Sequence, residues 1–192
     1  MATYRSPMDT YGVLSAAGRG EELEEPAAPG DPSGREAMRR GLALVRAYAR
    51  EDAAAVAAAL DGADRAAARQ LPFVAGDILR LVVGIVMSGP RTLTPADVVR
   101  TADTIAAAGP PHHELAVSQA VRAWADGGGA DLRAWWPDGA AAAHGAAVLA
   151  AALAVRAWGR GPFLGLLETF DEVADACDRG GYAASGLRTS TR

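Results

Sequence analysis

The sequence predicts an all-α protein in which six or seven helices form a single orthogonal bundle or a short stack of helical hairpins. Apolar residues recur at intervals of three and four, as on one face of a helix, and no segment is a convincing strand. Alanine, the strongest helix former, makes up about a quarter of the chain. Because alanine buries little apolar area, we expect a thin core between closely spaced helices.

The first helix is expected to begin after Ser33. Its apolar face comprises Met38, Leu42, Val45 and Ala49. A second, alanine-rich helix follows, because Asp52 is a typical N-cap and Asp61-Gly62 marks a helix end.

The third helix is expected to run from about Asp64 to Met87, with Pro72 either bending or restarting it. Its apolar stripe comprises Leu71, Val74, Ile78, Leu81 and Ile85. Its polar stripe comprises Asp77, Arg80, Gly84 and Ser88. We interpret this polar stripe as a water-facing edge, and a buried ion pair or anion site is the alternative. Glycine weakens a helix, so we expect close helix approach to compensate at Gly76 and Gly84.

Thr94-Pro95-Ala96-Asp97 has the N-cap, first-turn proline and first-turn acid of a fourth helix, which ends at Gly109. The next helix is expected from His112 to Ala125, followed by a short piece at residues 131–136. A long helix opens at Pro137 and reaches Trp158, and the last helix runs from Pro162 to Asp178. These helices form one domain at 33–179, between a disordered acidic tail (1–32) and a flexible tail (180–192).

Composition excludes several kinds of chemistry. The chain has no lysine, so it forms no lysine Schiff base and has no P-loop lysine. Its net charge of −4 provides no overall attraction for nucleic acid or for an anionic membrane. One cysteine and no signal-peptide pattern are typical of a cytoplasmic protein, and we read Cys177 as a buried structural thiol.

Four residues are weak candidates for metal ligands. His112 and Glu114 begin the fifth helix, with His144 as the remaining imidazole, and Asp171 and Asp175 lie four apart on the last helix. The acidic stripe there resembles the aspartate-rich motif of isoprenoid synthases over five residues, but a second acidic motif is missing. We therefore interpret these residues as solvated helix surface, and expect no catalytic residue and no cofactor.

Arg133, Trp135 and Trp136 are the predicted interaction residues. Arginine and tryptophan dominate the energetics of protein interfaces. Consecutive residues on a short helix cannot both face the core, which would leave one indole partly exposed. Packing of both rings over the end of the bundle is the alternative.

The sequence thus favours a non-enzymatic interaction or scaffold protein that binds another protein or associates with itself. One alternative is a small-molecule-binding or metal-dependent enzyme with a pocket between helices, whose ligand the sequence does not identify. The other is an oligomeric DNA-binding regulator that uses residues 94–124. Nucleic acid is disfavoured because the second helix of that segment begins with an acid and carries a single arginine.

Overall fold

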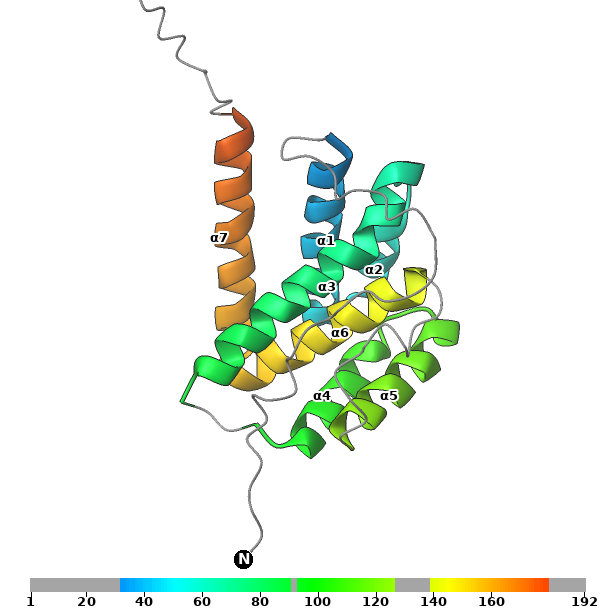
Figure 1. The fold of residues 1–192 in the computed structure, drawn as a ribbon, viewed down its shortest axis with the longest axis vertical. Helices are drawn as coiled ribbons and strands as arrows, with labels where there is room; N and C mark the ends of the chain where they lie inside the picture. The colour runs from blue at the N-terminus through cyan, green and yellow to red at the C-terminus, as the bar shows by residue number, and fades with distance from the viewer. Residues whose placement is uncertain (1–31, 91–92, 127–138, 180–192) are drawn as a thin grey trace, which may run out of the picture.

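The computed structural model describes residues 32–90, 93–126 and 139–179, apart from the side chains of 124 and 173–179. These residues form seven α-helices and no strand, so the predicted all-α bundle is confirmed (Figure 1). The helices are α1 (Pro32–Arg50), α2 (Ala53–Leu60), α3 (Arg65–Ser88), α4 (Pro95–Ala106), α5 (Pro111–Ala125), α6 (Gly139–Trp158) and α7 (Arg160–Arg179). The short helix predicted at 131–136 and the C-terminal tail lie outside the described residues, as does the N-terminal tail apart from residue 32.

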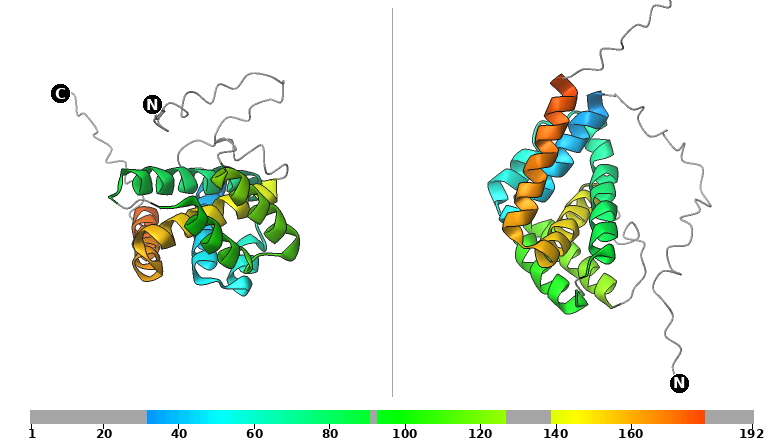
Figure 2. Two further views of the ribbon diagram at one scale, coloured as in Figure 1. Left: turned by 90° about the horizontal axis from the view of Figure 1, so that it is seen from below. Right: turned by 90° about the vertical axis from the view of Figure 1, so that its left-hand side faces the viewer.

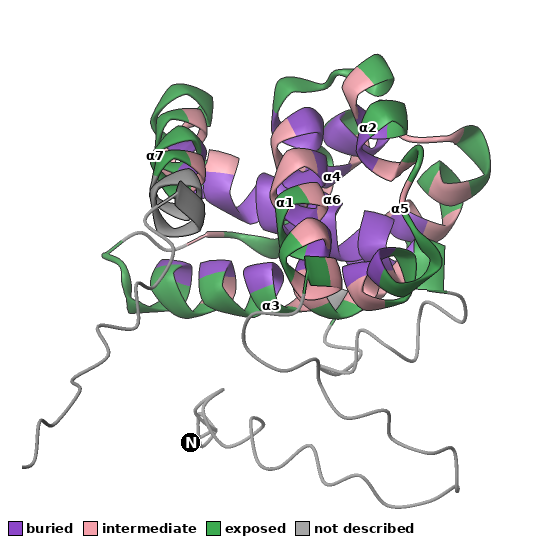
Figure 3. Cartoon of the chain, turned by 90° about the horizontal axis from the view of Figure 1, so that it is seen from above, coloured by how far each residue is buried: buried purple, intermediate pink, exposed green. Residues whose placement is uncertain are grey.

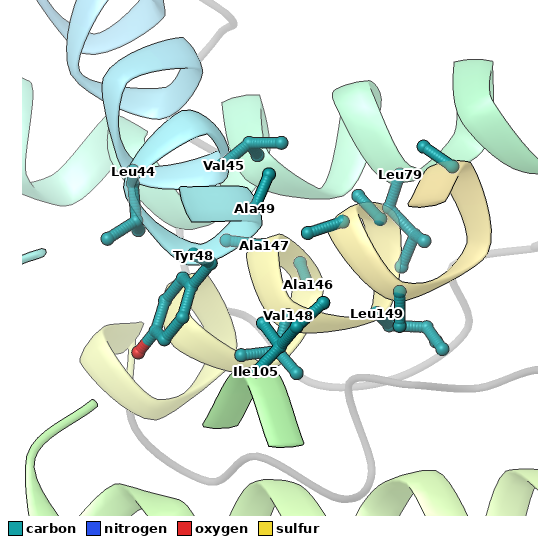
Figure 4. Packing of buried hydrophobic residues seen from close by; sticks show 14 of the residues in the cluster. Leu44, Val45, Tyr48, Ala49, Leu79, Ile105, Ala146, Ala147, Val148 and Leu149 are labelled. Atoms are coloured by element: carbon teal, nitrogen blue, oxygen red, sulfur yellow. The ribbon is translucent and has the colours of Figure 1, made fainter. Parts of the chain in front are cut away.

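The long alanine-rich helix α6 is the centre of the bundle. Fourteen of its twenty residues are buried, and α1, α3, α4, α5 and α7 all pack against it. Figure 3 shows this buried centre, and Figure 4 shows Tyr48 of α1, Leu79 of α3 and Ile105 of α4 around it. Many of the buried residues of the core are alanines, which allow the surrounding helices to approach closely.

The other helices lie around α6 in three groups. α3 runs beside α6, α1 and α7 stand across these two helices, and α4 and α5 form an antiparallel hairpin on another side (Figures 1 and 2). The short α2 packs against α1. Because five helices share one central partner, the described residues form a bundle and not a stack of hairpins.

Local capping explains where the helices begin. The side chains of Asp52 and Asp64 accept hydrogen bonds from backbone amides in the first turns of α2 and α3, at 3.0 and 2.7 Å. Thr94 caps α4 and accepts from the Asp97 amide at 3.2 Å, as predicted. The Thr94 hydroxyl also donates to the Asp97 carboxylate and, with smaller contributions from Arg156 and Arg100, lowers the pKa of Asp97.

The predicted buried face of α1 is partly wrong, although Val45 and Ala49 are buried as expected. Met38 is 43% exposed and Leu42 is only partly buried, whereas Leu44 and Tyr48 face the core. A Cβ atom placed on Gly41 would lie 2.7 Å from Val74 Cγ1, so α1 and α3 are in close contact at this glycine. That close approach turns the face containing Gly41 toward α3 and rotates Met38 outward.

The predicted apolar stripe of α3 is also partly wrong. Leu71 and Ile78 are buried as expected, but Leu81 and Ile85 are 53% and 45% exposed. The helix continues through Pro72 and buries a different set in its second half: Leu79, Val82 and Val86. A Cβ atom on Gly76 or Gly84 would meet no atom within 4 Å, so close approach within the described chain does not compensate for these two glycines.

We expect Gly41→Leu to destabilise the protein by about 1–3 kcal/mol, because the new side chain must displace Val74 from the α1–α3 contact. Gly165→Leu is the matched control, since a Cβ atom added at that exposed position of α7 would meet no atom within 4 Å, and leucine raises the helix propensity. Urea unfolding measures both changes. Equal stability of the two variants would contradict the close approach.

Candidate functional site

A cluster of ionisable rings lies where α1, α5 and α6 meet. The hydroxyl of Tyr48 hydrogen-bonds to Nδ1 of His144, and the two rings lie edge to face with centroids 5.8 Å apart. His113 stacks on His144 with a centroid distance of 4.5 Å, and His112 follows at 4.1 Å from His113. The fold thus brings together all three histidines of the chain, although His144 lies 31 residues after His113 in the sequence.

Burial governs the chemistry of this cluster. His144 is 1% exposed and is the only buried polar or charged side chain among the described residues. Burial raises the pKa of the Tyr48 phenol well above its ordinary value of 10.0, so the hydroxyl stays protonated at neutral pH. The hydrogen bond between the phenol and Nδ1 of the imidazole gives each of these buried atoms a partner, which lowers the cost of burying them.

The turn between α4 and α5 closes over the Tyr48 hydroxyl. A Cβ atom on Gly109 would lie 2.6 Å from that oxygen, so only glycine fits there without a shift. This close contact covers the hydroxyl on the side of the turn. The Tyr48–His144 pair therefore acts as a polar contact that joins α1 to α6 beneath the turn.

The ring cluster does not form a metal centre. Metal ligands must direct their donor atoms at one point, but His113 and His144 are stacked with their planes 33° apart. The Nδ1 atom of His144 is already bonded to Tyr48. Accordingly, among the described residues no three His, Cys, Asp or Glu side chains are arranged to hold a metal ion.

The four predicted metal candidates do not converge. His112 and Glu114 are on α5, whereas Asp171 is on α7 at the opposite side of the bundle (Figure 1). Asp175 lies in α7, and its side chain is outside the described residues, as is that of Cys177. No site made from the two helices is therefore assembled by the residues that the structure describes.

Two acids on α7 form ion pairs with α1, and both side chains remain partly exposed, at 39% for Asp171 and 60% for Glu168. Asp171 forms an ion pair with Arg46, which also donates to the Leu167 carbonyl at 3.1 Å, and Arg50 lies 3.4 Å from Glu168. The apolar side chains of α7 are only partly buried. Phe163 and Leu167 are buried, but Leu166 and Phe170 are 40% and 43% exposed.

The predicted interaction residues Arg133, Trp135 and Trp136 fall within residues 127–138, outside the described part of the chain.

Exposed apolar side chains gather instead on α3. We call its solvent side, made of Phe73, Asp77, Arg80, Leu81, Gly84, Ile85, Met87 and Ser88, the outward face of α3. Its apolar residues include Phe73 and Met87, which are 58% and 65% exposed. Figure 3 shows that this exposed side forms one edge of the described helices. A shallow depression on it is lined by Arg80, Leu81, Gly84, Ile85, Ser88 and Gly89.

The sequence pattern did not predict this surface, because Leu81 and Ile85 are four residues apart, and that spacing is typical of the buried face of a helix. A usable signal was present, since residues 78–87 are apolar nearly all around the helix. A helix that packs against the bundle on one side only must then expose apolar side chains on the other.

Two polar side chains of the α4–α5 hairpin, which we considered for DNA binding, contact other residues of the bundle. His113 stacks on buried His144, and Arg122 pairs with Asp103 at 2.6 Å. These two side chains at opposite ends of α5 are thus engaged within the bundle.

Two described helices, α3 and α6, are long and apolar enough to cross a membrane by length and composition alone. Most of α6 is buried inside the bundle, as in the core helix of a globular protein, whereas only a third of the most apolar part of α3 is buried.

Comparison of the chain with protein-family models, with curated proteins and with solved structures finds no match.

We expect Gly109→Ala to destabilise the protein by about 1–3 kcal/mol, because the methyl group collides with the Tyr48 hydroxyl. In a Tyr48→Phe background the same change should cost less, since the nearest remaining ring atom is 3.5 Å from the methyl position. A double-mutant cycle by urea unfolding measures this coupling. Additive effects would show that the turn does not touch the phenol.

Alkaline pH should destabilise the wild-type protein more than Tyr48→Phe. The folded state holds the Tyr48 proton more tightly than the unfolded state, so the stabilisation is complete below about pH 10 and declines as pH rises toward the folded pKa. Unfolding at a series of pH values between about 8 and 11 measures the difference. Parallel stability curves for the two proteins would contradict the raised pKa.

Proposed function

We propose that this chain is a non-enzymatic interaction protein that binds a protein helix through the outward face of α3. The observation that carries the proposal is the exposure of Leu81, Ile85 and Met87 on one helix, beside the depression over Gly84. Contiguous exposed apolar residues on the surface of a protein commonly mark a binding site. An amphipathic helix laid into an apolar groove is a recurring form of such recognition.

Charge at the centre of the surface favours a protein partner over a lipid bilayer. Asp77 and Arg80 lie in the middle of the outward face, with side chains 57% and 67% exposed. Membrane-surface helices keep their charges, which are mainly basic, on the side away from the apolar face. A protein partner accommodates a central acid and base by supplying opposite charges.

The surface also explains a glycine that weakens α3. Gly84 costs the helix roughly 1 kcal/mol relative to alanine, and no described neighbour requires it. At a helix–helix interface, a glycine lets the backbone of a partner come close. Binding at the outward face supplies this compensation from outside the chain.

Site-specific photo-crosslinking in the cells that make the protein tests the proposal. With p-benzoylphenylalanine in place of Leu81, we expect a covalent adduct with a protein, and none with the probe at exposed Ala58 of α2. Mass spectrometry of the adduct identifies the partner.

A second substitution shows whether the apolar surface causes binding. Ile85→Asp should reduce the adduct at position 81 at least tenfold, because a carboxylate replaces an apolar contact. Leu115→Asp is the matched control: Leu115 is 66% exposed on α5, away from the outward face. The absence of any adduct at position 81, or an equal loss in both variants, would overturn the proposal.

A further inference from the structure

We infer that the partner of the outward face of α3 is α3 of a second copy of this chain, packed antiparallel across a two-fold axis. The inference rests on the proposed function and names the occupant of the same surface. It follows from the order of residues along α3, from their exposure, and from the depression over Gly84.

The outward face contains a seam with coiled-coil spacing. Residues at alternating intervals of three and four form it: Gln70, Phe73, Asp77, Arg80, Gly84 and Met87. Gln70 is partly buried and the other five residues are exposed. This spacing keeps a helix in continuous contact with a partner helix over several turns. α3 has 24 residues, or roughly 36 Å, which is long enough for such a contact.

The seam is complementary to itself in the antiparallel direction. A two-fold axis midway between Asp77 and Arg80 places Asp77 opposite Arg80 of the second copy, and the reverse contact occurs by symmetry. The same axis places Phe73 opposite Gly84 of the second copy. Acid thus meets base at the centre, and an aromatic ring meets a glycine on either side.

Parallel packing of the same seam is unfavourable. It would place Asp77 opposite Asp77 of the second copy, and Arg80 opposite Arg80 of the second copy. Juxtaposed like charges at an interface are costly, and charged residues at seam positions set helix orientation in this way. The order of charges therefore selects the antiparallel pair.

The depression over Gly84 is suited to the aromatic ring. Its lining includes Leu81 and Ile85, and a Cβ on Gly84 would meet no atom within 4 Å. A Phe73 side chain from the second copy would rest on the glycine backbone beside these two apolar side chains. The Phe73 side chain is 58% exposed.

The surroundings of α3 permit the approach. α3 lies at the edge of the described helices in both orthogonal views, and no described helix projects beyond its outward face (Figures 2 and 3). Within one chain Asp77 and Arg80 already form an exposed ion pair one turn apart. Exposed pairs of this kind contribute little to stability, so exchanging them for contacts between copies costs little.

Sedimentation equilibrium on the full chain from about 1 μM to about 1 mM, which covers weak to moderate affinities, measures self-association. We expect a concentration-dependent dimer. Asp77→Arg alone and Arg80→Asp alone should each weaken the dimer at least tenfold, because each places two like charges opposite each other. The double variant Asp77→Arg/Arg80→Asp should restore it.

Mixing the two single variants is the sharpest test. Each variant repels itself, but in a mixed antiparallel pair every charged contact joins an arginine to an aspartate. We therefore expect a heterodimer from two proteins that are monomeric when separate. Gly84→Leu should also abolish the dimer while leaving the monomer folded, and Gly165→Leu on α7 should leave the dimer intact.

Three outcomes would overturn the inference. The first is a wild-type protein that stays monomeric at every concentration, and the second is a pair of single variants that form no heterodimer. The third is an adduct at position 81 with a different protein, or with residues 1–31 or 127–138 of the same chain. An adduct with a different protein leaves the proposed function standing and removes only the second copy as partner. No adduct at all removes both.

Discussion

Five helices pack around α6, and its alanine side chains are what allow them to do so. A central helix with large side chains would hold its neighbours farther apart and leave gaps between them. Alanine brings the backbones close, so that leucine, valine and isoleucine side chains from the outer helices fill the remaining space. Alanine also limits the apolar area that each contact buries, so the stability of the folded protein depends on many small contacts.

The single buried polar residue of the described core follows from this crowding. His144 lies on α6, where every direction leads into another helix, so its Nδ1 atom needs a partner within the protein. Tyr48 supplies it from α1, and Gly109 leaves room for the phenol beneath the α4–α5 turn. Three elements distant in the chain are thereby fixed relative to one another by one hydrogen bond and one close contact.

The way α3 packs on the central helix α6 leaves one side of α3 exposed. α3 packs on α6 and α1 with one side only, yet its second half is apolar on both sides. The side that faces away from α6 is left exposed with Leu81, Ile85 and Met87. Gly84, the central acid and base, and the depression over Gly84 all lie on that side, which is why we assign binding there and not to the ring cluster.

The starts of the helices were predictable from the sequence because capping is local. Asp52 and Thr94 bond to amides only three residues away, so their roles do not depend on the rest of the fold. The alanine-rich centre and the all-α class were predictable for the same reason, since helix propensity and turn residues act over short distances.

The tertiary structure alone decided which side of each helix is buried and which side chains meet. Leu81 and Ile85 have the spacing of a core stripe, but the position of α6 turns Leu79, Val82 and Val86 inward instead. The contact between Tyr48 and His144 spans 96 residues of sequence, and no local pattern marks it. The spacing of apolar residues in the sequence shows that a helix has an apolar and a polar side, whereas only packing against neighbouring helices determines which side faces water.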